Sequence, residues 1–243
     1  MRFDLNCDLG EGEPGARTEA LMRVITSANV ACGGHAGDVA GMERCVELAK
    51  KNKVRLGAHP GAVDAAGFGR GDLRITAAEL ELRLLQQVGA LAQIAHVHRV
   101  RLHHIKLHGA LYHATERDKR LAGAYIEIVR RRWPNAVIYA WAGGTVAKLA
   151  KSMVWGEAFL DRNYLGNGKL VPRSGTHALL QSGREVRERL EQLARGTVVS
   201  VAGNVIRVHP RTICVHGDTP RAVAFARLAR ALSSQAGFGT RSA

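Results

Sequence analysis

The chain of 243 residues is 46% hydrophobic and 23% charged, a composition typical of a globular protein with a sizeable core. No apolar run approaches the roughly 18 residues of a membrane helix, and the first ten residues carry acids where a signal peptide is apolar, so we expect a cytoplasmic protein without a membrane partner. The net charge of +14 is spread over helix-like segments without interleaved aromatic residues, which predicts solvated helix faces and no nucleic-acid partner.

Short apolar runs alternate with amphipathic segments along the whole chain. The apolar runs lie near 3–9, 25–32, 54–59, 102–107, 136–141, 157–160 and 212–216, with an extra one near 197–201. Helical periodicity marks 38–51, 77–96, 116–132, 144–152, 183–195 and 219–235. Strands that alternate with helices form a parallel sheet. We therefore predict an α/β protein whose sheet is either doubly wound or closed into a barrel.

Polar residues recur on one face of these predicted strands. In DLNCDLGE, residues 4–11, Asp4, Asn6 and Asp8 alternate with apolar residues. The corresponding face of the later strands carries His59, His104, Lys106, His108, Glu157, Asp161, Thr212, Cys214 and His216. A closed barrel would turn this face inward, with histidines around its mouth. The pattern favours a functional site at the carboxyl ends of the strands over an edge strand in water.

Histidines and carboxylates gather where these runs end. HAGD (35–38), AHPG (58–61), LHGALY (107–112) and VHGD (215–218) each place a histidine at the turn into a helix, where Asp218 is equally explained as a helix N-cap. Asp8, Glu11, His35 and His59 have the side chains that bind a divalent metal ion, with Asp8, His35 and His59 as the metal candidates. The same groups can also move protons on an amide without a metal, and the sequence leaves both readings open.

Two further residues are candidates for ligand binding. Lys106 is costly to bury unless it meets an anion or a carboxylate. Arg70 belongs to the glycine-rich loop GFGRGD, residues 67–72, which has the composition of a lid. For nucleotides the sequence offers no P-loop, because GNGK (166–169) lacks the spacing and the following Ser or Thr.

Taken together, eight blocks of the sequence resemble the family of 5-oxoprolinase A subunits, also called LamB/YcsF-like. They are DLNCDLGE (4–11), SANVACGGHAGD (27–38), GAHPG (57–61), GFGR (67–70), KLHGALY (106–112), DR (161–162), LVPR (170–173) and ICVHGD (213–218). The resemblance implies a single-domain, seven-stranded (β/α) barrel over residues 1–243, TIM-barrel-like and similar to the polysaccharide-deacetylase type. It also implies ATP-dependent opening of 5-oxoproline to L-glutamate, with Mg²⁺ accompanying the ATP and with companion subunits B and C.

The residues expected at this site fall into two groups. The catalytic candidates are Asp8, His59, His108, Asp4, Glu11 and His216. The substrate-binding candidates are Asn6, Asn29, His35, Arg70, Lys106, Tyr112, Glu157, Asp161 and Asp218. We expect a carboxylate such as Asp8 to direct water to the lactam carbon while a histidine protonates the ring nitrogen.

Five positions depart from the family pattern: Gly34, Gly71, Leu107, His113 and Leu160. Gly34, Gly71 and Leu107 flank the predicted cavity, so they leave the exact lactam or amide open. Two other functions remain open at this stage. One is a metal-dependent amide or N-acetyl hydrolase that works without ATP, and the other is a substrate-binding subunit without activity of its own.

Overall fold

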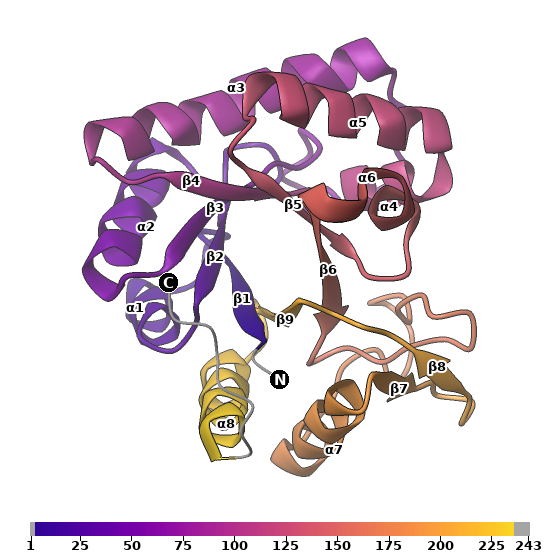
Figure 1. Cartoon of the computed structure of the whole chain (residues 1–243). Helices are drawn as coiled ribbons and strands as arrows, with labels where there is room; N and C mark the ends of the chain where they lie inside the picture. Colours follow the sequence, from indigo (N-terminus) through magenta and orange to yellow (C-terminus); the bar gives the residue numbers. More distant parts are fainter. Residues whose placement is uncertain (1–2, 236–243) are drawn as a thin grey trace.

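The computed structural model describes residues 3–235, and its centre is a closed barrel of seven parallel strands (Figure 1). These strands are β1 (Asp4–Leu9), β2 (Ser27–Ala31), β3 (Arg55–His59), β4 (Leu102–Lys106), β5 (Val137–Trp141), β6 (Val154–Phe159) and β9 (Thr212–His216). Strand β9 pairs with both β1 and β6, which closes the sheet. The predicted seven-stranded β/α barrel is therefore confirmed.

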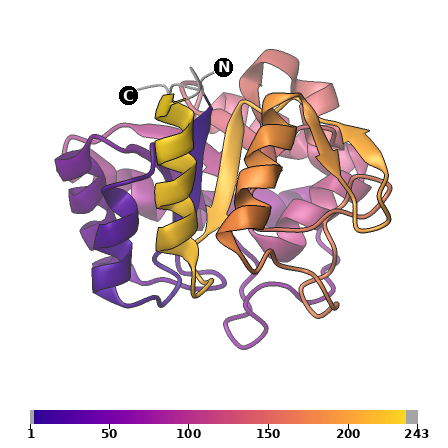
Figure 2. The ribbon, with the colours of Figure 1, turned by 90° about the horizontal axis from the view of Figure 1, so that it is seen from below.

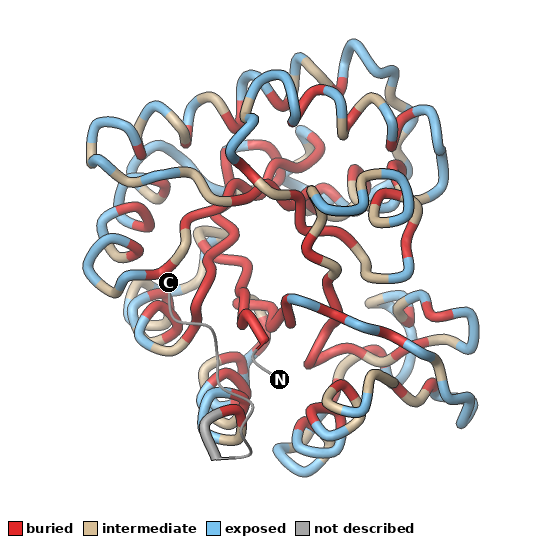
Figure 3. Tube along the Cα trace, viewed as in Figure 1, coloured by how far each residue is buried: buried red, intermediate tan, exposed pale blue. Residues whose placement is uncertain are grey.

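Helices surround the barrel, and their buried positions face the strands (Figure 3). They are α1 (Gly15–Met22), α2 (Val39–Asn52), α3 (Ala77–Val97), α4 (Gly109–Arg117), α5 (Lys119–Arg132), α6 (Thr145–Ala150), the 3₁₀ helix η1 (Lys151–Met153), α7 (Gly183–Ala194) and α8 (Ala222–Gln235). Local sequence sets where they begin: α3, for example, starts at a capping box in which Thr76 and Glu79 exchange hydrogen bonds. A short hairpin of β7 (Thr197–Val199) and β8 (Val205–Arg207) lies outside the barrel.

The structure corrects several predicted boundaries. Helix α1 was not predicted, because it buries only three residues and follows Pro14 without a side-chain cap. The predicted helix 116–132 is interrupted at Asp118, whose extended backbone ends α4 and whose carboxylate caps α5. Strand β6 begins at Val154, three residues before the predicted run, since Gly156 interrupts the apolar pattern. The extra run near 197–201 forms only the outer hairpin.

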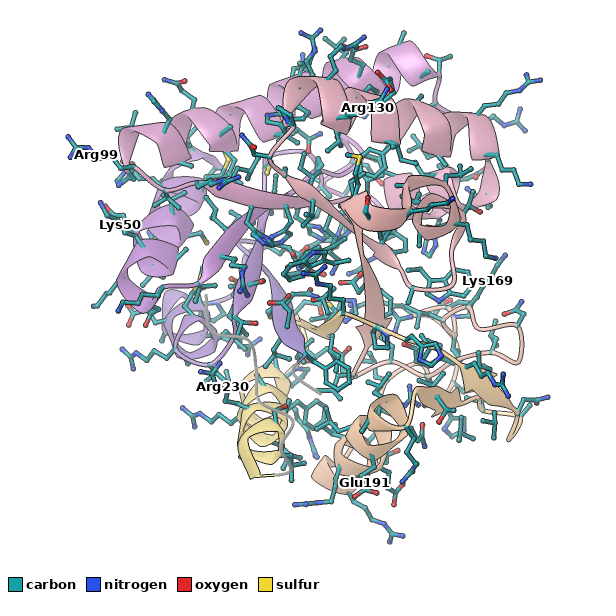
Figure 4. All side chains as sticks on the ribbon, in the orientation of Figure 1. Lys50, Arg99, Arg130, Lys169, Glu191 and Arg230 are labelled. Carbon is teal, nitrogen blue, oxygen red and sulfur yellow. The ribbon has the colours of Figure 1, made fainter. Side chains whose placement is uncertain are left out.

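The polar faces of the barrel strands point into the barrel, where side chains converge (Figure 4). The register aligns them in levels: Asp4 pairs with Thr212, Asn6 with Cys214, and Asp8 with His216. All three polar residues of β1 are buried. The interior of this barrel is thus a stack of hydrogen-bonded polar side chains rather than the apolar layers common in β/α barrels.

The two ends of the barrel differ. Strand β1 starts at one end, and long loops project from the opposite end, where the strands finish (Figure 2). Labelled basic side chains such as Lys50, Arg99, Arg130 and Arg230 point outward from different elements around the barrel (Figure 4). Among residues 3–235, no helix is both long and apolar enough to cross a membrane.

Candidate active site

A cavity of about 500 Å³ opens at the carboxyl ends of the strands. Its wall comes from the ends of β1, β3, β4, β6 and β9, from the loops after β3 and β4 with the start of α4, and from the loop between β6 and α7. Its lining includes Asp8, His59, Arg70, Lys106, His108, Tyr112, Phe159, Arg162, Arg173 and His216. The structure thus brings Asp8, His59 and His108 together in one cavity, as their shared strand faces predict.

An ion-paired group forms the floor of this cavity. Lys106 Nζ lies 2.8 Å from Asp8 Oδ1 and 3.0 Å from Glu157 Oε1. Burial would raise the pKa of Asp8, but His59 and Lys106 hold it well below its usual range. Burial would lower the pKa of Lys106, but the carboxylates around it hold it well above its usual range. The anion that buried Lys106 was expected to need is therefore supplied by the chain itself, and Asp8 stays ionised.

The side chains of His59 and His108 face each other beside Asp8. His59 Nδ1 lies 2.8 Å from the Lys106 carbonyl oxygen, and His108 Nε2 lies 3.0 Å from the Phe68 carbonyl oxygen. A carbonyl oxygen only accepts, so each of these nitrogens donates, and one nitrogen of each ring is left to face the other ring. Those two nitrogens, His59 Nε2 and His108 Nδ1, are 2.9 Å apart. Hydrogen bonds to the backbone therefore direct the two remaining ring nitrogens at one point.

Glu11 and His35 complete a group of four around that point. Glu11 Oε1 lies 2.9 Å from His35 Nε2, 3.4 Å from His108 Nδ1 and 3.7 Å from His59 Nε2. The rings of His35 and His108 are stacked, with centroids 3.6 Å apart. Of the three predicted metal candidates, His35 and His59 belong to this group, whereas Asp8 lies beside it, 3.5 Å from His59 Nε2. Three imidazoles and a carboxylate are suitable ligands for a divalent metal ion.

Burial sets the protonation of this group. It lowers the pKa of His35 to about 3, with His59 adding to the shift. It also depresses the pKa of His108, together with His59 and His35. It raises the pKa of Glu11 well above its usual range, and the nearby charges of Asp8 and Asp218 add to this. The rings of His35 and His108 are therefore neutral near pH 7.

His216 and Asp161 form a second pair at the rim. The His216 ring Nδ1 lies 2.9 Å from Asp161 Oδ1, and the backbone N–H of His216 donates to Asp161 Oδ2. Burial would raise the pKa of Asp161, but these contacts with His216 keep it below its usual value. The ring of Phe159 stacks on His216. Asp161 thus orients His216, whose other ring nitrogen is left for the cavity.

A basic wall completes the cavity. Asp218 accepts from Arg70 at 3.1 Å and from Arg173 at 2.8 Å, which ties the loops after β3, β6 and β9 together. Within the described part of the chain, the buried Nη2 of Arg173 has no hydrogen-bond partner. Arg162 donates to the Val171 carbonyl and thereby holds the segment that carries Arg173. An anionic group in the cavity would satisfy Arg173.

Three other predicted residues hold the acidic groups of the cavity: Asn6 and Asn29 from beneath it, and Tyr112 from its wall. Asn29 donates to Asp8 and to Asn6, both at 2.7 Å, so the two amides lie beneath the Asp8 carboxylate. The Tyr112 hydroxyl reaches Glu157 at 3.5 Å and does line the cavity. These contacts orient the acidic groups rather than present a free binding group.

Asp4 does not join the group at the cavity. It lies at the other end of β1, where Oδ1 accepts from Thr26 and Ser27, both at 2.6 Å. Its Oδ2 accepts from Tyr139 at 2.9 Å and from Thr212 at 2.7 Å. The shared strand face placed Asp4 in the predicted catalytic set, but four side-chain hydroxyls and the Arg55 guanidinium occupy its two oxygens. This placement corrects that assignment.

Arg162, Arg173 and Phe159 were not among the predicted site residues. Their only signals were the DR and LVPR blocks and an aromatic residue two positions before Asp161. The departures Leu107 and His113 also line the cavity. Gly34 has a packing reason, since a side chain there would collide with Gln87 and with the Gly61 carbonyl, which are hydrogen-bonded to each other.

This fold and this cavity define the class of protein: a seven-stranded β/α barrel with an acidic, histidine-rich site at the carboxyl ends of its strands. A sequence model described as the LamB/YcsF family matches residues 3–243. The chain belongs to the LamB/YcsF family.

Individual relatives agree with this family. The chain is 42% identical to the 5-oxoprolinase A subunit of Syntrophobacter fumaroxidans, over 91% of this chain and 90% of the relative. It is also 42% identical to the 5-oxoprolinase A subunit of Tolumonas auensis, over 97% of both chains. The crystal structure of the lactam utilization protein from Thermus thermophilus superposes with a TM-score of 0.90 at 34% identity and covers both chains completely.

Proposed function

We propose that this chain is the A subunit of an ATP-dependent 5-oxoprolinase and that it binds 5-oxoproline in the cavity. The names of relatives 42% identical over nine-tenths of the chain support this reaction. The observation that carries it is the ionised Asp8 carboxylate, set between Lys106 and His59 on the floor of a cavity with a basic wall. Such a cavity suits a small lactam that carries a carboxylate.

The reaction divides into steps that these groups can serve. ATP transfers its terminal phosphoryl group to the lactam oxygen, which makes the ring carbon a better electrophile. Water adds to that carbon while Asp8 takes its proton. The ring C–N bond then breaks as a histidine protonates the nitrogen, and this leaves an acyl phosphate. A second water releases phosphate and L-glutamate.

Arg173 is the residue best placed to hold the substrate carboxylate. Its Nη2 has no partner among the described residues, and its Nη1 is fixed by Asp218. A guanidinium that is already oriented binds a carboxylate with less loss of freedom. Lys106 is less suited to this task because Asp8 and Glu157 already neutralise it.

Companion subunits B and C and Mg²⁺ for the ATP belong to the same proposal, as does a cytoplasmic location. The word "subunit" in the names of the relatives supports partners, and the sequence offers no P-loop. The test is 5-oxoproline-dependent ATP cleavage by the purified chain, alone and with the products of neighbouring genes. We expect glutamate only with partners. Equal rates with the chain alone would contradict the need for partners, and no reaction in either case would contradict the function.

A second function is a metal-dependent amide or N-acetyl hydrolase, favoured by the group of Glu11, His35, His59 and His108. A divalent ion held there would polarise a carbonyl group or a water molecule. This function predicts amide hydrolysis without ATP. The same assay, run without ATP and with added metal, separates the two functions.

A further inference from the structure

We infer that Glu11, His35, His59 and His108 bind one divalent ion of the first transition series, of the Zn²⁺ type. This inference goes beyond the proposed function, because ion binding is compatible with either reaction and is measured without substrate. One donor atom from each residue lies within 4.8 Å of the other three. All four residues lie on or just after β1, β2, β3 and β4, which are consecutive in the barrel.

The orientation of the rings is the first support. The carbonyl oxygens of Lys106 and Phe68 take the outer ring nitrogens of His59 and His108, so that the two remaining ring nitrogens face each other at 2.9 Å. Two lone pairs at that distance repel unless a cation or a proton lies between them. Hydrogen bonds from the outer ring nitrogen to a backbone carbonyl are also what orient metal-binding histidines in general.

The spacing of the donors is the second support. With metal–ligand bonds of roughly 2.1 Å, neighbouring donors lie about 3.0 Å apart for right-angled ligands and about 3.4 Å apart for tetrahedral ones. Glu11 Oε1 lies 2.9 Å, 3.4 Å and 3.7 Å from the nitrogens of His35, His108 and His59. These values bracket both geometries, and the three histidines come from three separate segments: the loop after β2, the end of β3 and the start of α4.

The surroundings are the third support. Glu11, His35 and His59 are almost fully buried, and His59 and His108 also line the cavity. An ion there would be held from behind by Glu11 and His35 and would be reachable from the cavity. Imidazole donors favour Zn²⁺, Co²⁺ or Ni²⁺ over Mg²⁺, so this ion is distinct from the Mg²⁺ that accompanies ATP.

The loop after β3 is built closely over this group. Phe68 has a φ of 52° and Gly69 a φ of 60°, so both residues adopt the left-handed conformation. A side chain at Gly69 would approach His35 Cβ to 2.7 Å. The loop therefore accepts left-handed backbone at two successive residues while it presents the Phe68 carbonyl to His108.

A neighbouring group is a poorer metal site. The ligand atoms of Asp8, Cys214 and His216 also lie within 4.8 Å of one another. However, Lys106 Nζ contacts Asp8 Oδ1 at 2.8 Å and Cys214 Sγ at 3.1 Å. A positive charge already occupies the place that a second ion would need.

The test is metal binding by the full-length chain, with no lactam or ATP present. The protein is treated with a chelator, dialysed and titrated with Co²⁺ and Zn²⁺. We expect one ion per chain, visible absorption bands for bound Co²⁺ that Zn²⁺ removes, and a higher thermal midpoint. Excess Mg²⁺ should not displace the Co²⁺. A chain that binds no Co²⁺ would show that protons alone satisfy the lone pairs, and this would overturn the inference.

Variants locate the site. Glu11→Gln and His59→Gln should each weaken Co²⁺ binding by more than the roughly 10- to 100-fold that loss of an outer hydrogen-bond partner costs. His96→Gln, at an exposed histidine near the end of α3, should bind as the unmodified chain does. Thermal unfolding of the metal-free variants checks that each is folded. If His59→Gln does not fold, Glu11→Gln still tests the site, because glutamine has nearly the same shape as glutamate. Unchanged affinity in folded Glu11→Gln and His59→Gln would place the ion elsewhere and overturn the inference.

Discussion

Strand β1 carries an aspartate towards each of its ends, and the two carboxylates have different partners. At the start of the strand, Asp4 accepts hydrogen bonds from four side-chain hydroxyls, and Arg55 lies 3.3 Å away. At its end, Asp8 pairs with Lys106 and faces a cavity. Both residues are buried and lie on the same face of the same strand. Their difference is one of partners rather than of exposure.

This contrast separates structural polar groups from reactive ones. Around Asp4 each donor finds an acceptor within its own layer, so the layer is complete. Around Asp8 the ring nitrogens of His59 and His108 face each other at 2.9 Å, and Arg173 Nη2 is without a partner within residues 3–235. Buried and rigidly held polar groups that lack hydrogen-bond partners are typical of a preorganised ligand-binding site.

Asp8→Asn should give the largest effect. The amide is nearly isosteric, so the fold should persist, but the carboxylate that takes a proton from water is lost. We expect the partner-supported 5-oxoprolinase rate to fall by roughly 10²- to 10⁴-fold. The measurement pairs this rate with the thermal midpoint of the same variant. A folded variant with a near-normal rate would show that Asp8 is not the base.

Asp4→Ala should have the opposite profile. Removing this carboxylate leaves the hydroxyls of Tyr139 and Thr212 without their acceptor in a closed layer, which should lower the free energy of unfolding by about 3 kcal/mol. Activity per folded molecule should be retained. Urea unfolding measures the loss. As a control, Asp118→Ala removes an exposed helix cap and should cost only about 1 kcal/mol.

Alternation along the strands was sufficient to predict which polar residues enter the barrel. It was not sufficient to separate Asp4 from Asp8, because period 2 gives the face of a strand but not its depth in the barrel. Depth depends on register, which pairs Asp4 with Thr212 and Asp8 with His216. Parallel strands are joined through helices, so no short turn in the sequence specifies that register.

The site residues that came from loops were harder to predict. Arg173 lies in the long connection between β6 and α7, where no periodicity applies. Its position depends on Arg162, which holds the Val171 carbonyl, and on a bridge between Tyr164 and Leu170. The tautomers of His59 and His108 likewise depend on carbonyl groups of other segments, Lys106 and Phe68. Such contacts are tertiary, and a single sequence carries no local signal of them.

Arg173→Gln should affect binding more than chemistry. If Nη2 holds the substrate carboxylate, losing a charged hydrogen bond of roughly 1.5–3 kcal/mol should raise KM by about 10- to 100-fold, with kcat little changed. Arg184→Gln, at an exposed arginine in α7 that pairs with Glu188, is the matched control. A lower kcat at unchanged KM would instead assign Arg173 to the reaction itself.

The smallest predicted effect is a loss of stability at acid pH. It arises from His103, at the end of the barrel away from the cavity. Burial, with the positive charge of Arg55, lowers the pKa of His103 to about 4, whereas an unfolded histidine has a pKa of about 6.5. Between these values the unfolded chain binds the proton and the folded chain does not, so stability is present above pH 6.5 and is lost as the pH falls toward 4. We expect the thermal midpoint to drop over this range and His103→Gln to reduce the drop slightly, because the folded side chain is only partly buried. His96→Gln, which replaces an exposed histidine in α3, is the matched control. If His103→Gln and the unmodified chain lose stability in parallel down to pH 4, the acid sensitivity belongs to other groups, of which the fully buried His104 is the next to test.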